Sequence, residues 1–412
     1  MTVGGEVLDC PVSYSLACDL SKERSESFKS VPQKVQHQIG LNVAWRSSDL
    51  AYLPNPSRGQ TSFKSIPFAL NSVGGSTLTK NSLNYPSAET AIKQANFVSA
   101  RDQITYETIT SIAPGENFIT LSPDIVHTLP KLFKKEVDKH FEAFKTNNDW
   151  PNTPYILFQA NDLYIKDEGV EKISTTLAHA AKTQNLSIVF QPAGTAYGHD
   201  SLEALAKLAE ATALKLSGGG IEAHFQPDRN LWLQVSLISH AACYVGTSLH
   251  GRIVASAFAR PRVGLKNQKV SRYATTWEES DFQPHGTKIE DLNDAIEKAT
   301  KTPSSTLSTF AERQSTLALD SFEQLKSSLD IARTPRNTEE IKKRIDFFKI
   351  KSALLESQVL RNRVVDTEVQ LYLENKKFSS TQHELHRILK SPIWRITSPL
   401  RALKKQLKLK SF

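Results

Sequence analysis

The stretch Tyr244-Val245-Gly246-Thr247-Ser248-Leu249-His250-Gly251-Arg252 decides the fold, because its character changes halfway along. It continues the apolar run Ala242-Cys243-Tyr244-Val245, which is typical of a buried strand. Small and hydroxyl residues follow, and a helix of small residues begins at or just after His250. In open α/β sheets, ligands bind where strands end, and a helix amino terminus offers free N–H groups to an anion. The stretch therefore predicts a phosphate- or carboxylate-binding turn at Gly246, Thr247 and Ser248.

Strands and helices alternate on both sides of this turn. The expected strands are residues 65–75, 118–124, 155–159, 186–192, 242–245 and 261–265. The expected helices are residues 103–112, 169–184, 201–216, 231–239 and 252–258. Repeated strand–helix units of this length predict parallel, doubly wound sheets.

The chain of 412 residues is long enough for two cores and an appendage. A polar stretch with two prolines, residues 146–154, marks the boundary between the cores. We therefore predict an α/β chain with two Rossmann-like doubly wound domains and a C-terminal helical extension. The predicted segments are an N-terminal domain (1–150), a C-terminal domain with the His250 motif (151–310), a closing helix and linker (311–336), an amphipathic helix or coiled coil (337–390) and a basic amphipathic tail (391–412).

The amino terminus is an unusual place for a domain to begin. Met1-Thr2-Val3-Gly4-Gly5-Glu6-Val7-Leu8 reads as the end of a buried strand that runs into a Gly-Gly turn. We expect one or more preceding strand–helix units to be absent, which would leave the N-terminal domain incomplete.

Composition places the chain among ordinary globular proteins, with 39% hydrophobic and 23% charged residues. No apolar run approaches the ~18 residues of a membrane span, and the amino terminus lacks a signal-peptide pattern, so we predict a cytoplasmic protein. The cysteines, Cys10, Cys18 and Cys243, are odd in number and not at zinc-site spacings, so we expect reduced, mostly buried thiols. No cluster of carboxylates and histidines predicts a metal site.

The net charge of +8 is concentrated at the carboxy terminus. Residues 387–412 contain eight lysines and arginines and no acidic residue, and Trp394, Ile396 and Leu400 lie among them. Such a segment lies on anionic lipid, where each basic residue contributes ~1 kcal/mol. We predict a peripheral membrane contact through residues 391–412, and a solvated or partner-binding basic helix is the alternative. Nucleic acid is not an expected partner, because the cluster lacks stacking aromatics and a recognised fold.

Several segments, taken in order, carry a resemblance to a known family. They are Val3-Gly4-Gly5-Glu6-Val7-Leu8, Asn71-Ser72-Val73-Gly74-Gly75, Phe97-Val98-Ser99-Ala100-Arg101-Asp102, Ser122-Pro123-Asp124, Ser248-Leu249-His250-Gly251 and Ala259-Arg260-Pro261. Across roughly residues 3–280, the chain resembles a polysaccharide pyruvyl transferase.

This resemblance implies a glycosyltransferase-B-like pair of Rossmann-type domains. It also implies transfer of the enolpyruvyl group of phosphoenolpyruvate onto two sugar hydroxyls, which forms a pyruvate ketal and releases phosphate. The acceptor would be a lipid-linked or nascent glycan of an envelope or exopolysaccharide. Phosphoenolpyruvate is then the donor substrate, and no cofactor is implied.

The implied donor carries a carboxylate and a phosphate, so its pocket needs fixed cations, preferably arginines. Arg101 and Arg252 are the first candidates, and Lys266 is the third. Proton delivery to the enol methylene and proton removal from the hydroxyl suit a group that titrates near neutrality, which His250 provides. The pairs Gly4-Gly5 and Gly74-Gly75 are predicted to line the cleft between the domains.

Each assignment has a structural alternative. In that alternative, His250 only caps its turn, and Arg101 forms an ion pair with Asp102 at a helix start. Arg252 and Lys266 are then solvated charges without a ligand. The Gly74-Gly75 and Gly4-Gly5 pairs would be tight turns without a ligand, and His199-Asp200 would cap the helix that follows.

One departure from the family pattern concerns Ser248. The commoner pattern has arginine two residues before the histidine, and Arg252 substitutes for it only if its side chain reaches back to the pocket. Two other functions therefore stay open. One is a nucleotide-sugar-dependent glycosyltransferase, which would normally show an acidic residue that residues 248–256 lack, and the other is a truncated, non-catalytic homologue.

Overall fold

A computed structural model gives the fold and describes residues 2–44, 50–53, 67–75, 77–82, 85–116, 118–147, 153–196, 199–217, 220–279, 282–331 and 358–390. By internal contacts the chain forms one unit of residues 1–19 and 46–337 and another of residues 20–45 and 338–412. The predicted tail 391–412 lies outside the described residues.

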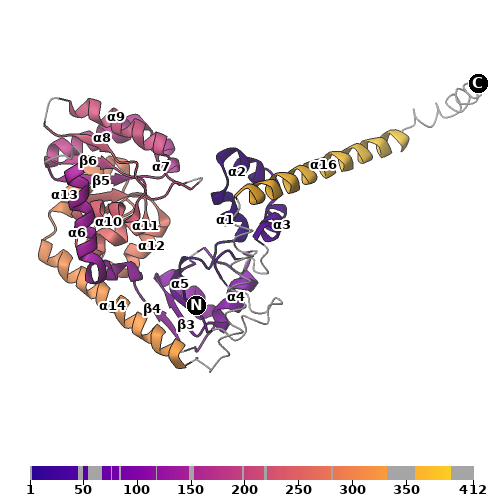
Figure 1. Cartoon of the computed structure of the whole chain (residues 1–412), viewed down its shortest axis with the longest axis horizontal. Helices are drawn as coiled ribbons and strands as arrows, with labels where there is room; N and C mark the ends of the chain where they lie inside the picture. Colours follow the sequence, from indigo (N-terminus) through magenta and orange to yellow (C-terminus); the bar gives the residue numbers. More distant parts are fainter. Residues whose placement is uncertain are drawn as a thin grey trace, which may run out of the picture. The chain divides into compact units, whose positions relative to one another are not determined.

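The first sheet is parallel, with strand order β1-β2-β3-β4. Figure 1 labels β3 and β4 of this sheet. Its strands are β1 (Thr2–Glu6), β2 (Ala69–Gly74), β3 (Phe97–Ala100) and β4 (Ile119–Leu121), and the neighbouring helices are α1 (Val12–Asp19), α4 (Tyr85–Gln94) and α5 (Gln103–Ile112). Helix α5 begins where Asp102 accepts a hydrogen bond from the Thr105 N–H at 2.9 Å. Ile92 of α4 and Ile109 of α5 join the apolar side chains of β2 and β3 in one core.

The second sheet is also parallel, with strand order β7-β6-β5-β8-β9. Its strands are β5 (Tyr155–Gln159), β6 (Ser187–Phe190), β7 (Ala223–Phe225), β8 (Cys243–Gly246) and β9 (Arg262–Gly264). The helices between and after them are α7 (Asp162–Glu168), α8 (Val170–Gln184), α9 (Leu202–Leu216), α10 (Leu231–His240), α11 (Leu249–Ala257), α12 (Gln268–Trp277) and α13 (Leu292–Thr300). Apolar clusters cover both faces, as the continuous apolar strands predict.

The strand order reverses between β5 and β8. From β5 the chain builds β6 and β7 on one side, and it then returns to build β8 and β9 on the other. Gln159 at the end of β5 is the register partner of Gly246 at the end of β8. Doubly wound sheets bind ligands at such a switch point, so the fold places the predicted turn where a ligand site is expected.

The predicted boundary near residue 150 does not match the packing of α6 (Leu129–Asn147), which joins η1 (Ile125–Thr128) to β5. Val137 and Phe141 of α6 belong to the core of the second sheet, together with Tyr155 and Leu157. The helix therefore packs with the second sheet, because its apolar stripe faces α10 and β5. The sequence boundary followed polar composition instead of packing.

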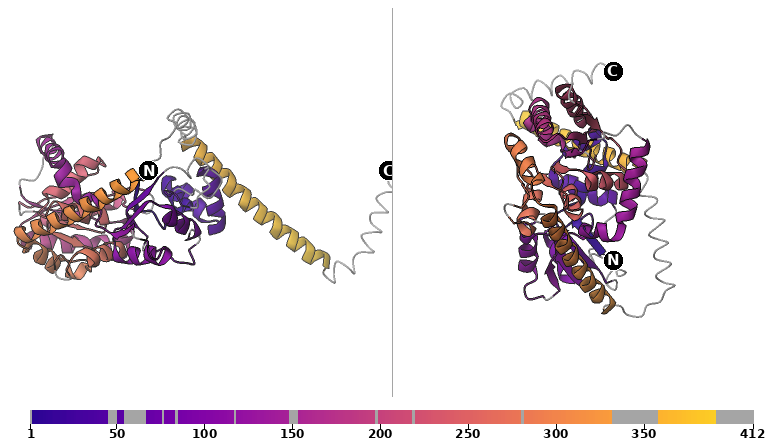
Figure 2. Two further views of the ribbon diagram at one scale, coloured as in Figure 1. Left: turned by 90° about the horizontal axis from the view of Figure 1, so that it is seen from below. Right: turned by 90° about the vertical axis from the view of Figure 1, so that its left-hand side faces the viewer.

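The predicted closing helix, residues 311–336, is part of a longer one. Helix α14 (Ser304–Ile331), orange in Figure 2, begins directly after Pro303, and Leu325 packs with Ala69 of β2 and Phe97 of β3. It thus returns to the first sheet.

The second unit is helical and consists of α2 (Lys22–Lys29), α3 (Gln33–Ala44) and α16 (Gln358–Lys390). Arg24 of α2 donates hydrogen bonds to Asp366 at 3.1 and 3.2 Å, and Val365 and Val369 of α16 are buried. The predicted segmentation had placed residues 20–45 in the N-terminal domain. The apolar face of α16 is what groups them with the C-terminal helix.

The α/β fold class with two parallel sheets is confirmed, and Cys10 and Cys243 are free and buried as predicted. Among the helices that the structure describes, none is long and apolar enough to cross a membrane. Within the same residues, no group of acidic, histidine and cysteine side chains suits a metal ion.

Candidate functional site

The predicted turn after β8 is held by its own hydroxyl residues. Ser248 caps α11 by accepting a hydrogen bond from the Gly251 N–H at 3.2 Å, and Thr247 Oγ1 accepts one from the Asn161 N–H at 3.1 Å. The Ser248 N–H donates to Gln159 Oε1 at 2.8 Å. Thr247 and Ser248 therefore stabilise the turn itself. The Ser248 and Gly251 N–H groups are already paired, although the predicted anion site relied on free N–H groups at this helix start.

The glycines that were predicted to bind substrate make room for neighbouring side chains. A Cβ at Gly246 would lie 2.9 Å from Gln159 Oε1 and would overlap the Tyr244 ring. At Gly74 it would lie 2.7 Å from Arg101 Nη2, and at Gly75 it would lie 2.6 Å from Leu8 Cβ. Each separation is too short for a real Cβ, so close packing alone accounts for all three glycines.

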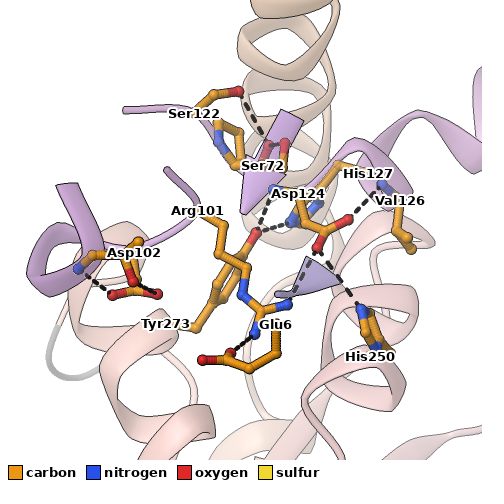
Figure 3. A network of polar contacts seen from close by, with 12 residues as sticks. Glu6, Ser72, Arg101, Asp102, Ser122, Asp124, Val126, His127, His250 and Tyr273 are labelled. Carbon is orange, nitrogen blue, oxygen red and sulfur yellow. Dashed lines mark hydrogen bonds and ion pairs between the residues drawn. The ribbon is translucent and has the colours of Figure 1, made fainter. Parts of the chain in front are cut away.

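A charged network lies at the carboxyl ends of the first sheet (Figure 3). The Arg101 side chain, 3% exposed, forms an ion pair with Glu6, and its Nη1 lies 3.9 Å from Asp124 Oδ2. Arg101 Nε and Nη1 are buried without a hydrogen-bond acceptor among the described residues. The alternative pairing with Asp102 is wrong, because Asp102 instead accepts hydrogen bonds from the Thr105 N–H and hydroxyl.

His250 joins this network from the second sheet. Its Nε2 lies 3.8 Å from Asp124 Oδ2, although 60% of the imidazole side chain is exposed (Figure 3). The protein packed around the ring lowers its pKa below the usual 6.5, because desolvation disfavours the charged form. The Asp124 carboxylate opposes this effect, whereas Arg101 and Lys269 add to it. His250 is therefore a neutral, accessible imidazole at neutral pH, beside a carboxylate that stabilises its protonated form.

The buried rings of His127 and Tyr273 support Asp124, one from each side of the contact between the two sheets. The Tyr273 oxygen accepts a hydrogen bond from the Asp124 N–H at 3.0 Å and lies 3.0 Å from His127 Nε2. Burial lowers the pKa of His127 to about 4, so this histidine stays neutral and supports Asp124 without adding charge. Tyr273 lies on α12 and His127 in η1, so these contacts join a helix beside the second sheet to the segment that follows β4 of the first sheet.

Arg252 does not reach the site, and the prediction that it binds substrate is wrong. It is 1% exposed, and Nη2 donates to Glu278 Oε2 at 2.7 Å and to the Gln283 carbonyl at 3.1 Å. Its Nη1 donates to the Pro284 carbonyl at 3.0 Å. Since these acceptors hold the guanidinium in the interior, Arg252 cannot replace the arginine that the family pattern places at Ser248.

The sequence singled out Lys266 as a candidate cation, but Lys269 is the lysine that affects the pKa of His250. Lys266 is exposed, and it is not among the groups that shift the pKa of His250 in the part of the chain that the structure describes. Lys269 is also exposed, but it is close enough to lower the pKa of His250 and of Cys10. Its place in the first turn of α12, within electrostatic range of His250, could not be inferred from the linear sequence.

Glu6 and Asp124 were also missed, although both lie within the segments that carried the family resemblance. Glu6 ends β1 and Asp124 follows β4, so their order in the chain was the available signal. Gln159, Glu278 and Tyr273 had no comparable signal, because their roles depend on contacts with distant residues.

Comparison with known families matches a large part of the chain. The family model for polysaccharide pyruvyl transferase matches residues 48–269, which is more than half of the 412 residues. The fold has two parallel α/β sheets, and the matched family is a family of transferases. The chain belongs to the polysaccharide pyruvyl transferase family.

Solved structures offer only distant likenesses. UDP-GlcNAc 2-epimerase from Neisseria meningitidis bound to UDP-GlcNAc has 13% identity and a TM-score of 0.41, covering 64% of this chain and 71% of that one. UDP-GlcNAc 2-epimerase from Methanocaldococcus jannaschii has 16% identity and a TM-score of 0.44, with 58% and 65% covered. A UDP-forming trehalose-phosphate synthase from Burkholderia xenovorans has 9% identity and a TM-score of 0.43, with 65% and 67% covered. Comparison with curated proteins gave no match.

Proposed function

We propose that this protein transfers the enolpyruvyl group of phosphoenolpyruvate to two hydroxyls of a sugar in an envelope or exopolysaccharide precursor, where it forms a pyruvate ketal. The observation that supports this most is the accessible imidazole of His250, 3.8 Å from the buried carboxylate of Asp124. A neutral histidine beside a carboxylate suits a reaction that needs one proton removed and one delivered.

In the proposed reaction, His250 accepts the proton of the first sugar hydroxyl as that oxygen bonds to C2 of the enol, and the electron pair of the C2–C3 double bond takes up a proton at C3 in the same step. The imidazolium, stabilised by Asp124, supplies that proton, and the C3 methylene becomes a methyl group. The second hydroxyl oxygen then bonds to C2 as the bond from C2 to the phosphate oxygen breaks. Its proton leaves with the phosphate, so atoms and charges balance.

For the donor, we propose a site around the start of α11. Lys269 would supply a cation close to His250, and Lys266 stays a candidate for a second. Arg101 is almost fully buried, so we assign it to holding Asp124. Its Nε and Nη1 groups, which have no acceptor among the described residues, would bind a donor anion only if that anion entered the interior. No cofactor is part of this proposal.

The acceptor that we propose is a lipid-linked or nascent glycan, met at the cytoplasmic face of the membrane. Residues 391–412 would contact anionic lipid there. Sedimentation with vesicles of phosphatidylglycerol and phosphatidylcholine, with the full chain compared with a chain ending at residue 390, tests this contact. Equal sedimentation of both chains would contradict it.

The test of the function is phosphate release from phosphoenolpyruvate with a panel of lipid-linked and nucleotide-activated acceptors, followed by mass spectrometry of the acceptor. His250→Ala should lower the rate by about 10²–10⁴-fold if the imidazole transfers protons. His179→Ala is the matched control, because it removes an exposed histidine of α8 far from the turn in sequence. Acceptor-dependent release that survives His250→Ala would contradict the mechanism. No release by folded protein, with turnover of a nucleotide sugar instead, would contradict the function.

A further inference from the structure

Gln159 occupies the switch point of the second sheet and contacts the turn that carries His250. It is 3% exposed at the end of β5. Its Oε1 accepts a hydrogen bond from the Ser248 N–H at 2.8 Å and another from the Thr247 hydroxyl at 3.3 Å. A single side-chain oxygen thus binds both residues between β8 and α11.

Asp200 determines which way the Gln159 amide faces. Gln159 Nε2 donates to both carboxylate oxygens of Asp200, at 3.0 and 2.9 Å. A flipped amide would place its oxygen against this carboxylate and its NH₂ against the Ser248 N–H, so both contacts would be repulsive. Asp200 is itself 8% exposed and accepts a hydrogen bond from the Ala193 N–H at 2.6 Å, so the pair is buried and fixed.

We propose that Gln159 and Asp200 are positioning residues, which set the turn at Thr247 and Ser248 and thereby the place of His250 relative to Asp124. Neither touches the reacting atoms in the proposed reaction. They act through Ser248, whose N–H is held by Gln159 and whose hydroxyl caps the helix on which His250 lies. The kinetic consequence rests on the proposed function, whereas the structural consequence does not.

The sharpest variant is Gln159→Glu, which keeps the shape of the side chain but replaces the donor NH₂ with a carboxylate oxygen. At neutral pH it would set two buried carboxylates against each other and disturb the turn. As the pH falls, the pair takes up one shared proton, and a protonated Glu side chain again donates to Asp200 and accepts from Ser248.

Gln191→Glu is the matched control. Gln191 is 2% exposed and follows the neighbouring strand β6, and its Nε2 has no hydrogen-bond partner among the described residues.

Two measurements on the full chain test the proposal. Hydrogen–deuterium exchange should show faster exchange at residues 247–251 in Gln159→Glu and Asp200→Asn than in Gln191→Glu, with the rest of the second sheet unchanged. Steady-state kinetics of Gln159→Glu should show kcat reduced about 10- to 100-fold, with little change in KM for phosphoenolpyruvate. The kcat of this variant should recover as the pH is lowered from 8 toward 6.5.

Equal exchange at residues 247–251 in Gln159→Glu and Gln191→Glu would overturn the proposal, as would kinetics that follow only the overall stability of each variant. A wild-type protein without pyruvyl transfer would defeat the proposed function alone, because the exchange measurement would still decide whether Gln159 and Asp200 hold the turn.

Discussion

Arg101 and Arg252 are both buried arginines near the switch point, yet they differ in how completely their donors are satisfied. Arg252 donates to two carboxylate oxygens of Glu278 and to two backbone carbonyls. Arg101 pairs with Glu6 and lies 3.9 Å from Asp124, while its Nε and Nη1 have no acceptor among the described residues. Complete pairing is typical of a structural charge, and incomplete pairing beside an exposed histidine is typical of a functional site. The comparison teaches that burial alone does not separate the two roles.

The largest effect on stability is expected at the completely paired arginine. Arg252→Gln should lower the free energy of unfolding by about 3–5 kcal/mol, because among the described residues it leaves the buried Glu278 with Arg262 as its one charged partner. Urea unfolding followed by circular dichroism measures this, with Arg313→Gln on the exposed face of α14 as the control. A loss as small as that of the control would contradict the structural role.

A smaller loss, about 1–3 kcal/mol, is expected for Arg101→Gln, because N–H groups without acceptors already cost free energy in the native protein. The same variant should lose activity, since Asp124 would no longer be held near His250. Unfolding and phosphate release measured side by side would show the two losses separately. If Arg101→Gln were as destabilised as Arg252→Gln, the distinction between the arginines would not hold.

A shift in the pH dependence of activity is expected when the contact between His250 and Asp124 is changed. Desolvation holds the pKa of His250 below 6.5, and the Asp124 carboxylate raises it, so Asp124→Asn should lower it further. Activity that needs the neutral imidazole is lost as the pH falls through this pKa, and the acid limb should therefore move to lower pH in the variant. NMR titration of the ring, assigned with His250→Ala, measures the direction. An upward shift would show that Asp124 does not face the imidazolium.

The smallest effect is expected for the lysines. Lys269→Ala should weaken apparent donor affinity by about two- to threefold, in line with the ~0.2–1 kcal/mol of an exposed charge, and should raise the pKa of His250. Lys266→Ala should weaken apparent donor affinity less than Lys269→Ala and should leave the pKa of His250 unchanged. KM for phosphoenolpyruvate, measured at low and moderate salt, compares them, and a larger effect of Lys266→Ala would restore the candidate that the sequence favoured.

Much of the fold could be predicted because strand and helix signals are local. The apolar runs at 155–159 and 242–245 became β5 and β8, and helix α5 occupies the predicted residues 103–112. The short strand β7 was not predicted, since its three residues are only half-buried and carry no apolar run. Residues 20–45 were assigned to the wrong unit, because their partner helix lies more than 300 residues further along the chain.

The sequence by itself determined the α/β class and the family, and it singled out His250 as the candidate catalytic residue, because these depend on local periodicity and on motifs of adjacent residues. Only the tertiary structure decided which charges meet. It placed Asp124 rather than Asp102 beside Arg101, turned Arg252 toward Glu278, and set Gln159 under the turn at Ser248. The physical reason is that electrostatic and hydrogen-bond partners are chosen by distances between atoms from different strands, and these distances exist only once the two sheets have packed.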